Sequence, residues 1–260
     1  MLKFCANLSL LFTEYDFINR FKAARNAGFK AVEMQFPYAL SAQDIRQQLD
    51  THQLELVLFN VDAGDLLQGG EGLAAVPELQ WQFEQALQQT VEYARILKPQ
   101  CINVLPGRCY NPKRLQDYNT TFKRNLLKTV EALQPLEITT VFEAINTLDM
   151  PDFIIHNSGQ MVSLLNEINH PGLKMQYDIY HMQRMQQSIL EFIQQYADQI
   201  GHFQFADVPG RGQPGTGSMD YETLFAAIEN SSYSGWIGAE YHPTVKTEDS
   251  LHWFHAYLSH

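Results

Sequence analysis

Four short apolar segments in the second half of the chain each carry an oxygen-ligand residue at or near the C-terminal end. The segments are residues 141–143, 175–178, 203–205 and 237–240, and the residues are Glu143, Asp178, Gln204 and Glu240. Short apolar runs predict buried strands, in which Asp and Glu are uncommon. A buried carboxylate costs several kcal/mol unless another group compensates its charge. These four positions therefore need either one common explanation or four separate ones.

The near-regular spacing of the four residues favours one shared compensating group. Successive members lie 35, 26 and 36 residues apart. A divalent cation fits three carboxylates and an amide, because Mg, Mn and Ca prefer hard oxygen ligands and Co or Zn also accept such a set. The alternative is that each side chain is satisfied locally. We predict a divalent metal, Mg, Mn or Co, with Glu143, Asp178, Gln204 and Glu240 as ligands.

The composition is typical of a soluble globular protein and restricts the partners. Of the 260 residues, 45% are hydrophobic and 18% are charged, and the net charge is −11. We therefore expect no nucleic-acid or membrane partner, whereas a small anionic substrate is compatible with this charge. The three cysteines follow neither a disulfide nor a zinc-binding spacing. Without a signal-peptide pattern or a long apolar run, we expect a cytoplasmic protein, and a homo-oligomer stays open.

Strand-like and helix-like segments alternate through the whole chain. Strands are expected at residues 4–10, 31–36, 54–60, 101–105, 138–143, 173–178, 200–205 and 236–240, with a helix after each; the sixth helix is expected at 187–197. Such repeated units predict parallel strands, in a closed barrel or a doubly wound sheet. The length and the absence of GxGxxG and GxxxxGK[ST] motifs favour the barrel. We predict an α/β fold, a (β/α)8 TIM barrel, with residues 1–260 as a single domain.

In such a barrel the active site lies at the C-terminal ends of the strands, so the four oxygen-bearing residues would meet there. Other polar residues are predicted at the same end: Asn7, Glu33, Asn60, Arg108, Asn146, His181, Asp207, Arg211 and His242. Either arginine could clamp a substrate carboxylate, and His181 could bind metal or substrate. The alternatives are solvated arginines, a loop histidine without a role, and asparagines that only hydrogen-bond at the barrel mouth. For Glu33, a role in the site and a purely structural role, as a barrel carboxylate that neighbouring groups satisfy, fit the sequence equally well.

Two loops have the composition of functional segments. Residues 61–77 are long for a connection in such a fold, which favours a lid or a binding loop. Residues 210–217 are rich in glycine with proline interleaved, and no helix opens directly after them. This pattern favours a flexible closing loop over a phosphate cradle.

Motifs along essentially the whole chain resemble the xylose-isomerase-like barrel enzymes and, within them, the hydroxypyruvate isomerase group. They are Ala6-Asn7-Leu8-Ser9, Ala31-Val32-Glu33, Phe142-Glu143-Ala144-Ile145-Asn146, Gln176-Tyr177-Asp178-Ile179-Tyr180-His181, His202-Phe203-Gln204-Phe205-Ala206-Asp207, Gly212-Gln213-Pro214-Gly215-Thr216-Gly217 and Trp236-Ile237-Gly238-Ala239-Glu240. The motifs of the last three strands are specific when taken together.

The resemblance implies a metal-dependent aldose–ketose isomerase that interconverts hydroxypyruvate and 2-hydroxy-3-oxopropanoate (tartronate semialdehyde). It implies the ligand set Glu143, Asp178, Gln204 and Glu240, with Glu143 and Glu240 as the two acid/base groups. A cis-enediolate route is the simplest mechanism, and a hydride shift competes with it. The alternatives are a 2-oxo-tetronate isomerase, a metal-dependent endonuclease-like hydrolase and a non-catalytic sugar-binding barrel.

Overall fold

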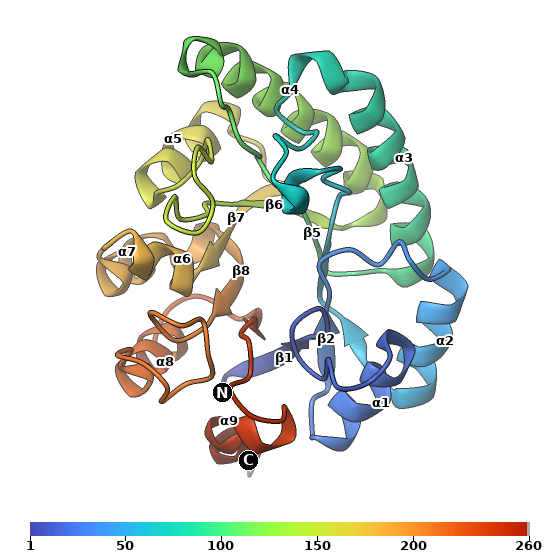
Figure 1. Ribbon diagram of the computed structural model, residues 1–260, viewed down its shortest axis with the longest axis vertical. Helices are drawn as coiled ribbons and strands as arrows, with labels where there is room; N and C mark the ends of the chain where they lie inside the picture. Colours follow the sequence, from blue (N-terminus) through green and yellow to red (C-terminus); the bar gives the residue numbers. More distant parts are fainter. Residues whose placement is uncertain (259–260) are drawn as a thin grey trace.

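Parallel strands and helices alternate along the chain and form a closed barrel in the computed structural model, which describes residues 1–258 (Figure 1). The strands are β1 (Lys3–Asn7), β2 (Ala31–Glu33), β3 (Glu55–Leu56), β4 (Leu58–Asn60), β5 (Cys101–Asn103), β6 (Thr139–Glu143), β7 (Leu173–Asp178), β8 (Ile200–Phe205) and β9 (Trp236–Ala239). The helices are α1 (Phe17–Asn26), α2 (Ala42–His52), α3 (Gln80–Leu97), α4 (Leu115–Leu133), α5 (Ser158–Ile168), α6 (Ile179–Arg184), α7 (Ile189–Tyr196), α8 (Tyr221–Glu229) and α9 (His252–Leu258). The helices surround the strands, and α9 lies beside β1.

The barrel closes at Val57, which separates β3 from β4. The strand order is β3-β2-β1-β9-β8-β7-β6-β5-β4, so the two halves of one extended segment pair with opposite ends of the sheet. The Val57 amide donates to the Val32 carbonyl, and the Val57 carbonyl accepts from the Cys101 amide, both at 2.8 Å. The predicted (β/α)8 TIM barrel is confirmed, and its third strand is the two-part segment β3–β4.

Residues typical of helix ends begin and end two of the helices. The Ser41 hydroxyl accepts from the Asp44 amide and caps α2. Gly28 has a φ of 101° just after α1, a conformation that a residue with a Cβ rarely adopts. The expected sixth helix corresponds to α7, but α6 was not predicted. It begins directly after β7, where the Asp178 side chain accepts from the Tyr180 amide and caps it without any glycine or proline as a signal.

The strands bury both of their faces, and the described residues form three hydrophobic clusters. The large one packs the outer faces of the strands against the helices and includes Phe4, Phe29, Phe205 and Phe254, with Phe29 and Phe254 stacked at 4.1 Å. A small one comes from six of the strands and Val57: Cys5, Ala31, Val57, Leu58, Cys101, Val141 and Trp236. The third lies among the loops after the strands: Ala63, Leu66, Leu105, Ile145 and Phe153. Cys5, Cys101 and Cys109 are buried free thiols.

No helix within residues 1–258 is long and apolar enough to cross a membrane.

Candidate active site

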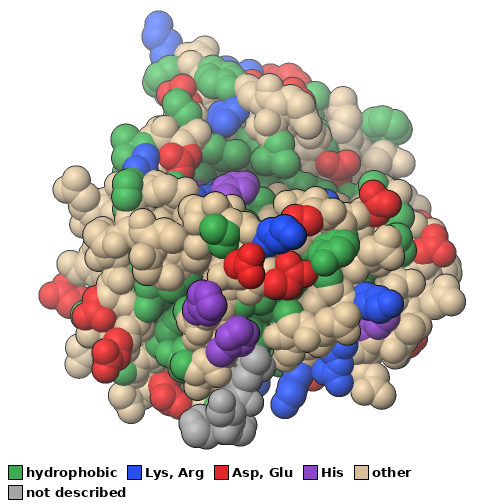
Figure 2. Space-filling model, turned by 60° about the horizontal axis from the view of Figure 1, so that its bottom comes forward, with side chains coloured by type: hydrophobic (Ala, Val, Ile, Leu, Met, Phe, Trp, Pro, Cys, Tyr) green, Lys and Arg blue, Asp and Glu red, His purple; other side chains and the backbone are tan. Residues whose placement is uncertain are grey.

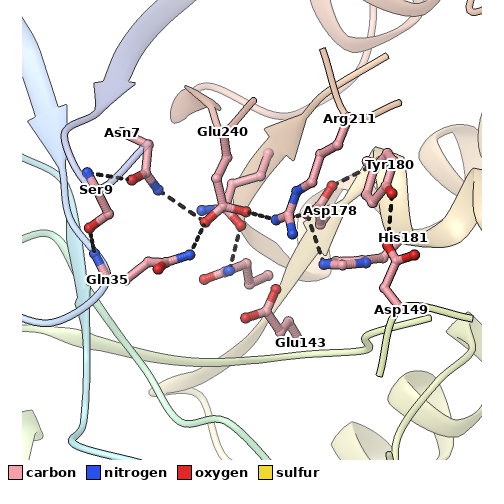
Figure 3. Close-up of polar contacts among 12 residues, drawn as sticks. Asn7, Ser9, Gln35, Glu143, Asp149, Asp178, Tyr180, His181, Arg211 and Glu240 are labelled. Carbon is pink, nitrogen blue, oxygen red and sulfur yellow. Dashed lines mark hydrogen bonds and ion pairs between the residues drawn. The ribbon is translucent and has the colours of Figure 1, made fainter. Parts of the chain in front are cut away.

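The four predicted ligand residues lie at the C-terminal ends of neighbouring strands, and Figure 3 shows three of them, Glu143, Asp178 and Glu240. Glu143 ends β6, Asp178 ends β7, Gln204 lies in β8 and Glu240 follows β9. In the sheet register Asp178 pairs with Gln204, which pairs in turn with Gly238. All four are buried, and three of them line a cavity of about 240 Å³ together with Arg211 and His181. The predicted convergence is therefore present in the structure.

Glu143 is a carboxylate whose surroundings favour its protonated form. Its Oε1 accepts from Asn103 Nδ2 at 2.8 Å. Burial and the nearby carboxylates Glu240 and Asp178 raise its pKa well above the ordinary value of a glutamate. Such a carboxyl group holds a proton more readily than an ordinary glutamate does, as a general acid requires.

The two carboxylate oxygens of Asp178 have different surroundings. Oδ1 accepts from the Tyr180 amide at 2.8 Å, which fixes the carboxylate at the start of α6. Oδ2 is buried without a hydrogen-bond partner among residues 1–258, although His181 Nε2 lies 3.4 Å away. Burial, reinforced by Glu240 and opposed by Arg211, raises the pKa of Asp178 to about 7. One oxygen thus remains available for a cation.

Glu240 is held by three donors, one of which is a guanidinium. Arg211 Nη2 lies 2.6 Å from Oε2, and Asn7 Nδ2 and Gln35 Nε2 lie 3.0 and 3.1 Å from Oε1. Arg211 Nη2 is also 3.8 Å from Asp178 Oδ2. Burial raises the pKa of Glu240 despite the opposing effect of Arg211. The arginine therefore lies between two of the carboxylates (Figure 3).

The loop that carries Arg211 is organised by Asp207. This buried carboxylate accepts from the backbone amides of Val208, Gly215, Gly217 and Met219. The Arg211 carbonyl accepts from the His242 amide at 2.8 Å, and the guanidinium lies 5.1 Å from the centre of the Tyr180 ring. Asp207 thus anchors the segment predicted as a closing loop, and whether the segment moves remains a prediction.

His181 has a defined tautomer. Asn146 Oδ1 accepts from the backbone amides of Leu148 and Asp149, so the Asn146 amide nitrogen faces His181 Nδ1, at 2.7 Å. Nδ1 is then the acceptor and Nε2 carries the proton. Burial and the positive charges of Arg211 and Arg184 hold the pKa of His181 well below its ordinary value, so the ring is neutral. His181 can donate one hydrogen bond into the cavity.

Gln204 belongs to a second polar group inside the barrel. Its Nε2 donates to Glu33 Oε1 at 2.7 Å, and its Oε1 accepts from Gln176 Nε2 at 2.6 Å. Glu33 also accepts from Asn7 Nδ2 at 2.9 Å and faces His202 Nε2 at 2.6 Å. Burial opposes ionisation of Glu33, but His202 and the amide donors hold its pKa below the ordinary value, so it is a carboxylate.

The remaining predicted substrate-binding residues fall into two groups. Asn7 and Asn60 line the cavity, and Asn60 Oδ1 accepts from Asn103 Nδ2 at 3.2 Å. Arg108 does not line this cavity in the described part of the chain. Its Nη1 faces the carbonyls of Leu66 and Gly70 at 3.4 Å, so the guanidinium supports the 61–77 loop. The structure therefore gives Arg108 a loop-stabilising position in place of the expected carboxylate clamp.

Sequence comparison places this architecture in a known family. Residues 21–257 match the family model described as xylose isomerase-like TIM barrel. The chain belongs to this family. The resemblance deduced from its motifs is thereby confirmed.

Relatives in the xylose isomerase-like family share nearly the full length of the chain. It is 40% identical to hydroxypyruvate isomerase of Escherichia coli over 99% of this chain and 100% of that protein. It is 35% identical to 2-oxo-tetronate isomerase of Pectobacterium atrosepticum, covering 99% and 98% of the two chains. A solved structure described as AP endonuclease, family 2, from Brucella melitensis superimposes with a TM-score of 0.95 at 35% identity, covering 99% of each chain. The curated relatives support the predicted isomerase activity.

The site's oxygen atoms fit the divalent cation that this family suggests. Glu143 and Asp178 each offer a carboxylate oxygen, and these atoms lie within 4.8 Å of each other and of a His181 nitrogen. The His181 ring nitrogens are engaged as a donor and an acceptor, so the ligand atoms of this group are the carboxylate oxygens. Asp178 Oδ2 lacks a hydrogen-bond donor in residues 1–258, and burial, together with repulsion from Glu240 and Asp178, raises the pKa of Glu143. Cys5, Glu33 and His202 form another cluster with ligand spacing, but their polar atoms bond to one another. The cation therefore fits the carboxylate site better.

Two polar residues at the site were not selected from the sequence. Asn103 contacts Glu143, and Gln35 contacts Glu240. Asn103 ends β5, so its place at a strand end was a usable signal. Gln35 lies just after β2, where no regular pattern distinguishes it. Asn146 was predicted at this end of the barrel without a role, and in the structure it contacts His181.

Proposed function

We propose that this protein interconverts hydroxypyruvate and tartronate semialdehyde with a divalent metal bound at Glu143, Asp178, Gln204 and Glu240. The observation that carries the proposal is the meeting of three buried carboxyl groups, Glu143, Asp178 and Glu240, with the Arg211 guanidinium beside a small cavity. The 40% identity to the E. coli hydroxypyruvate isomerase over the full length supports this substrate. A cavity of about 240 Å³ is below the ~300–1,000 Å³ usual for ligand pockets, which favours a small acid.

The reaction moves a carbonyl group to the adjacent carbon. A carboxylate removes a proton from C3 of hydroxypyruvate, and the electron pair of that C–H bond forms the C2–C3 double bond of a cis-enediolate. A carboxylic acid then delivers a proton to C2, the hydroxyl proton of C3 passes to the oxygen on C2, and C3 becomes the aldehyde. Glu143 and Glu240 are assigned these two proton transfers because both are buried with raised pKa values.

The other site residues bind and orient the substrate. A bound divalent cation would stabilise negative charge on the two substrate oxygens. Arg211 is the cationic side chain that lines the cavity of the described chain, so we assign it the substrate carboxylate. His181, which is neutral with Nε2 protonated, donates a hydrogen bond to a substrate oxygen. Asn7 and Gln35 keep Glu240 in place.

The first test is turnover of hydroxypyruvate by the purified protein, with and without EDTA, and with Mg, Mn or Co restored. Metal-dependent turnover that is lost in Glu143→Gln and Glu240→Gln supports the proposal. Running the reaction in D₂O separates the two mechanisms, because proton transfer introduces deuterium at C2 and a direct hydride shift does not. Absence of turnover despite bound metal would refute the hydroxypyruvate assignment.

A four-carbon substrate is the second candidate, favoured by the 35% identity to the Pectobacterium 2-oxo-tetronate isomerase. Comparing kcat/KM for hydroxypyruvate and 2-oxo-tetronate decides between the two acids.

Nucleic-acid cleavage, suggested by the description of the Brucella structure, is disfavoured. The net charge is −11, and the Lys and Arg side chains on the face in Figure 2 lie singly or in small groups among acidic ones. Binding a polyanionic backbone normally needs a continuous basic surface. DNA with an abasic site is the corresponding negative control.

A further inference from the structure

Glu33 is a fully buried carboxylate that the proposed proton transfers do not use. It ends β2, and both of its oxygens are occupied by donors from other strands. Oε1 accepts from the side-chain amides of Asn7 and Gln204, and Oε2 faces His202 Nε2 and Cys5 Sγ. A buried anion with four donors around it acts as a fixed acceptor, because each donor can satisfy it in only one orientation.

Glu33 determines which end of the Gln204 side-chain amide faces the carboxylate site. The two ends of a glutamine side-chain amide have nearly the same shape, but only the carbonyl oxygen can bind a cation. Glu33 accepts a hydrogen bond, so it attracts the Gln204 NH₂ group and turns the oxygen to the opposite side. That oxygen meets the Gln176 amide at 2.6 Å, which uses one of its two lone pairs. Without the anion, the reversed amide would present N–H groups toward the carboxylate site.

Asn7 links Glu33 to Glu240 through hydrogen bonds. Its single NH₂ group donates to both Glu33 and Glu240, at 2.9 and 3.0 Å. Its oxygen accepts from the Ser9 amide, which agrees with this orientation. Glu33 is thus connected through two oriented amides to two of the four proposed metal ligands.

The absence of a side chain at Gly238 leaves space for the Glu33 carboxylate. A Cβ built on Gly238, in β9, would lie 2.4 Å from Glu33 Oε2. Gly238 has no positive φ, so its lack of a side chain is explained by this close approach and not by backbone conformation. His202, which faces the same oxygen, is also fully buried. Glu33 is therefore enclosed on the β8 and β9 sides.

We propose that Glu33 is a positioning residue that sets the amide orientation of Gln204 and so makes Gln204 a metal ligand. The role rests on the proposed metal-dependent function and extends it to a residue that would not touch the metal or the substrate. Hydrogen-bonding partners of this kind typically change metal affinity by 10–100-fold when they are removed.

A double-mutant cycle on the full chain tests the proposal, with Mn²⁺ binding measured by calorimetry and folding checked by circular dichroism. Glu33→Gln in the native background is expected to weaken Mn²⁺ binding by about 10–100-fold. In a Gln204→Ala background, whose own Mn²⁺ affinity is already lowered, the same change is expected to have no further effect, because no amide remains to be oriented. A purely structural or electrostatic role of Glu33 would weaken binding in both backgrounds.

Equal losses in both backgrounds, or no loss in either, would overturn the role of Glu33. If Glu33→Gln does not fold, Gly238→Ala provides the same test, because its methyl group displaces the Glu33 carboxylate and keeps every polar group. This variant should also weaken Mn²⁺ binding, and unchanged binding would contradict the proposal. A wild-type protein that binds no Mn²⁺ would instead refute the metal site itself, and the Glu33 role would fall with it.

Discussion

Replacing Arg211 by glutamine should strengthen metal binding while weakening substrate binding. In the structure the Arg211 guanidinium donates to Glu240 and lies close to Asp178, so it compensates the carboxylates that a metal would otherwise bind. A cation that enters the site must weaken these contacts. The glutamine variant removes this competition and also removes the proposed partner of the substrate carboxylate.

The size of the effect follows from the geometry. Arg211 Nη2 is 2.6 Å from Glu240 Oε2, and the arginine side chain is 22% exposed, so water screens the contact only in part. A hydrogen bond between charged groups contributes about 1.5–3 kcal/mol. Since about 1.4 kcal/mol corresponds to a tenfold change in affinity, Arg211→Gln should bind Mn²⁺ about 10–100-fold more tightly. The KM for hydroxypyruvate should rise by about tenfold or more.

The assay is calorimetric titration of metal-free protein with Mn²⁺, followed by steady-state kinetics at saturating metal. Arg184→Gln is the matched control, because Arg184 pairs with Asp149 at 3.2 Å and this ion pair includes none of the four proposed ligands. This control should leave Mn²⁺ affinity nearly unchanged. Unchanged or weaker Mn²⁺ binding by Arg211→Gln would show that the guanidinium does not compete with the metal.

Three further predictions concern charge, tautomer and packing. Burial raises the pKa of Asp178 to about 7, from about 3.9 in the unfolded chain. Between these two values the metal-free folded protein binds more protons than the unfolded chain does. Its free energy of unfolding should therefore fall as the pH rises from about 4 to 7. Melting curves in EDTA check this, and a flat profile would contradict it. Asn146→Ala removes the donor to His181 Nδ1 and should lower kcat/KM by about five- to tenfold with little change in Mn²⁺ affinity. A variant with the same kcat/KM as the wild-type protein would argue against a role for the His181 tautomer. The Tyr177 hydroxyl is buried without a hydrogen-bond partner in the part of the chain described, while its ring stacks on Phe192 at 4.5 Å. Tyr177→Phe should therefore be neutral or stabilise by up to about 1 kcal/mol in denaturant unfolding, and a clear loss of stability would reveal a missed partner.

The sequence was sufficient for the parts of the site that regular strands position. Glu143 and Asp178 end their strands and Gln204 and Glu240 lie beside the ends of theirs, so alternating strands and helices were enough to predict that they meet. The side-chain contacts of these residues are less regular. The capping of α6 by Asp178 was hidden because the helix follows the strand without a breaker.

Positions that depend on loops or on contacts across the barrel were harder to predict from the sequence. Arg108 and Arg211 both follow strands beside glycine and looked equivalent in the sequence. The structure separates them, because Arg108 turns to the carbonyls of the 61–77 loop whereas Asp207 fixes the loop that directs Arg211 inward. Glu33 is 171 residues from Gln204, and no local pattern links them. Their pairing arises only when the closed barrel brings β2 and β8 together around Gly238.

The balance of charge in the site indicates the order in which metal and substrate bind. Arg211 faces the carboxyl groups of Glu143, Asp178 and Glu240, and full ionisation of all three would leave two net negative charges, which a divalent cation would compensate. Before metal binds, the guanidinium is engaged by Glu240 and a substrate carboxylate would enter an already anionic cavity. Once metal neutralises the carboxylates, Arg211 can turn to the substrate. Metal should therefore bind first. A titration of EDTA-treated protein with hydroxypyruvate should show much weaker binding than the same titration after Mn²⁺ is added, and equal binding in the two cases would exclude this order.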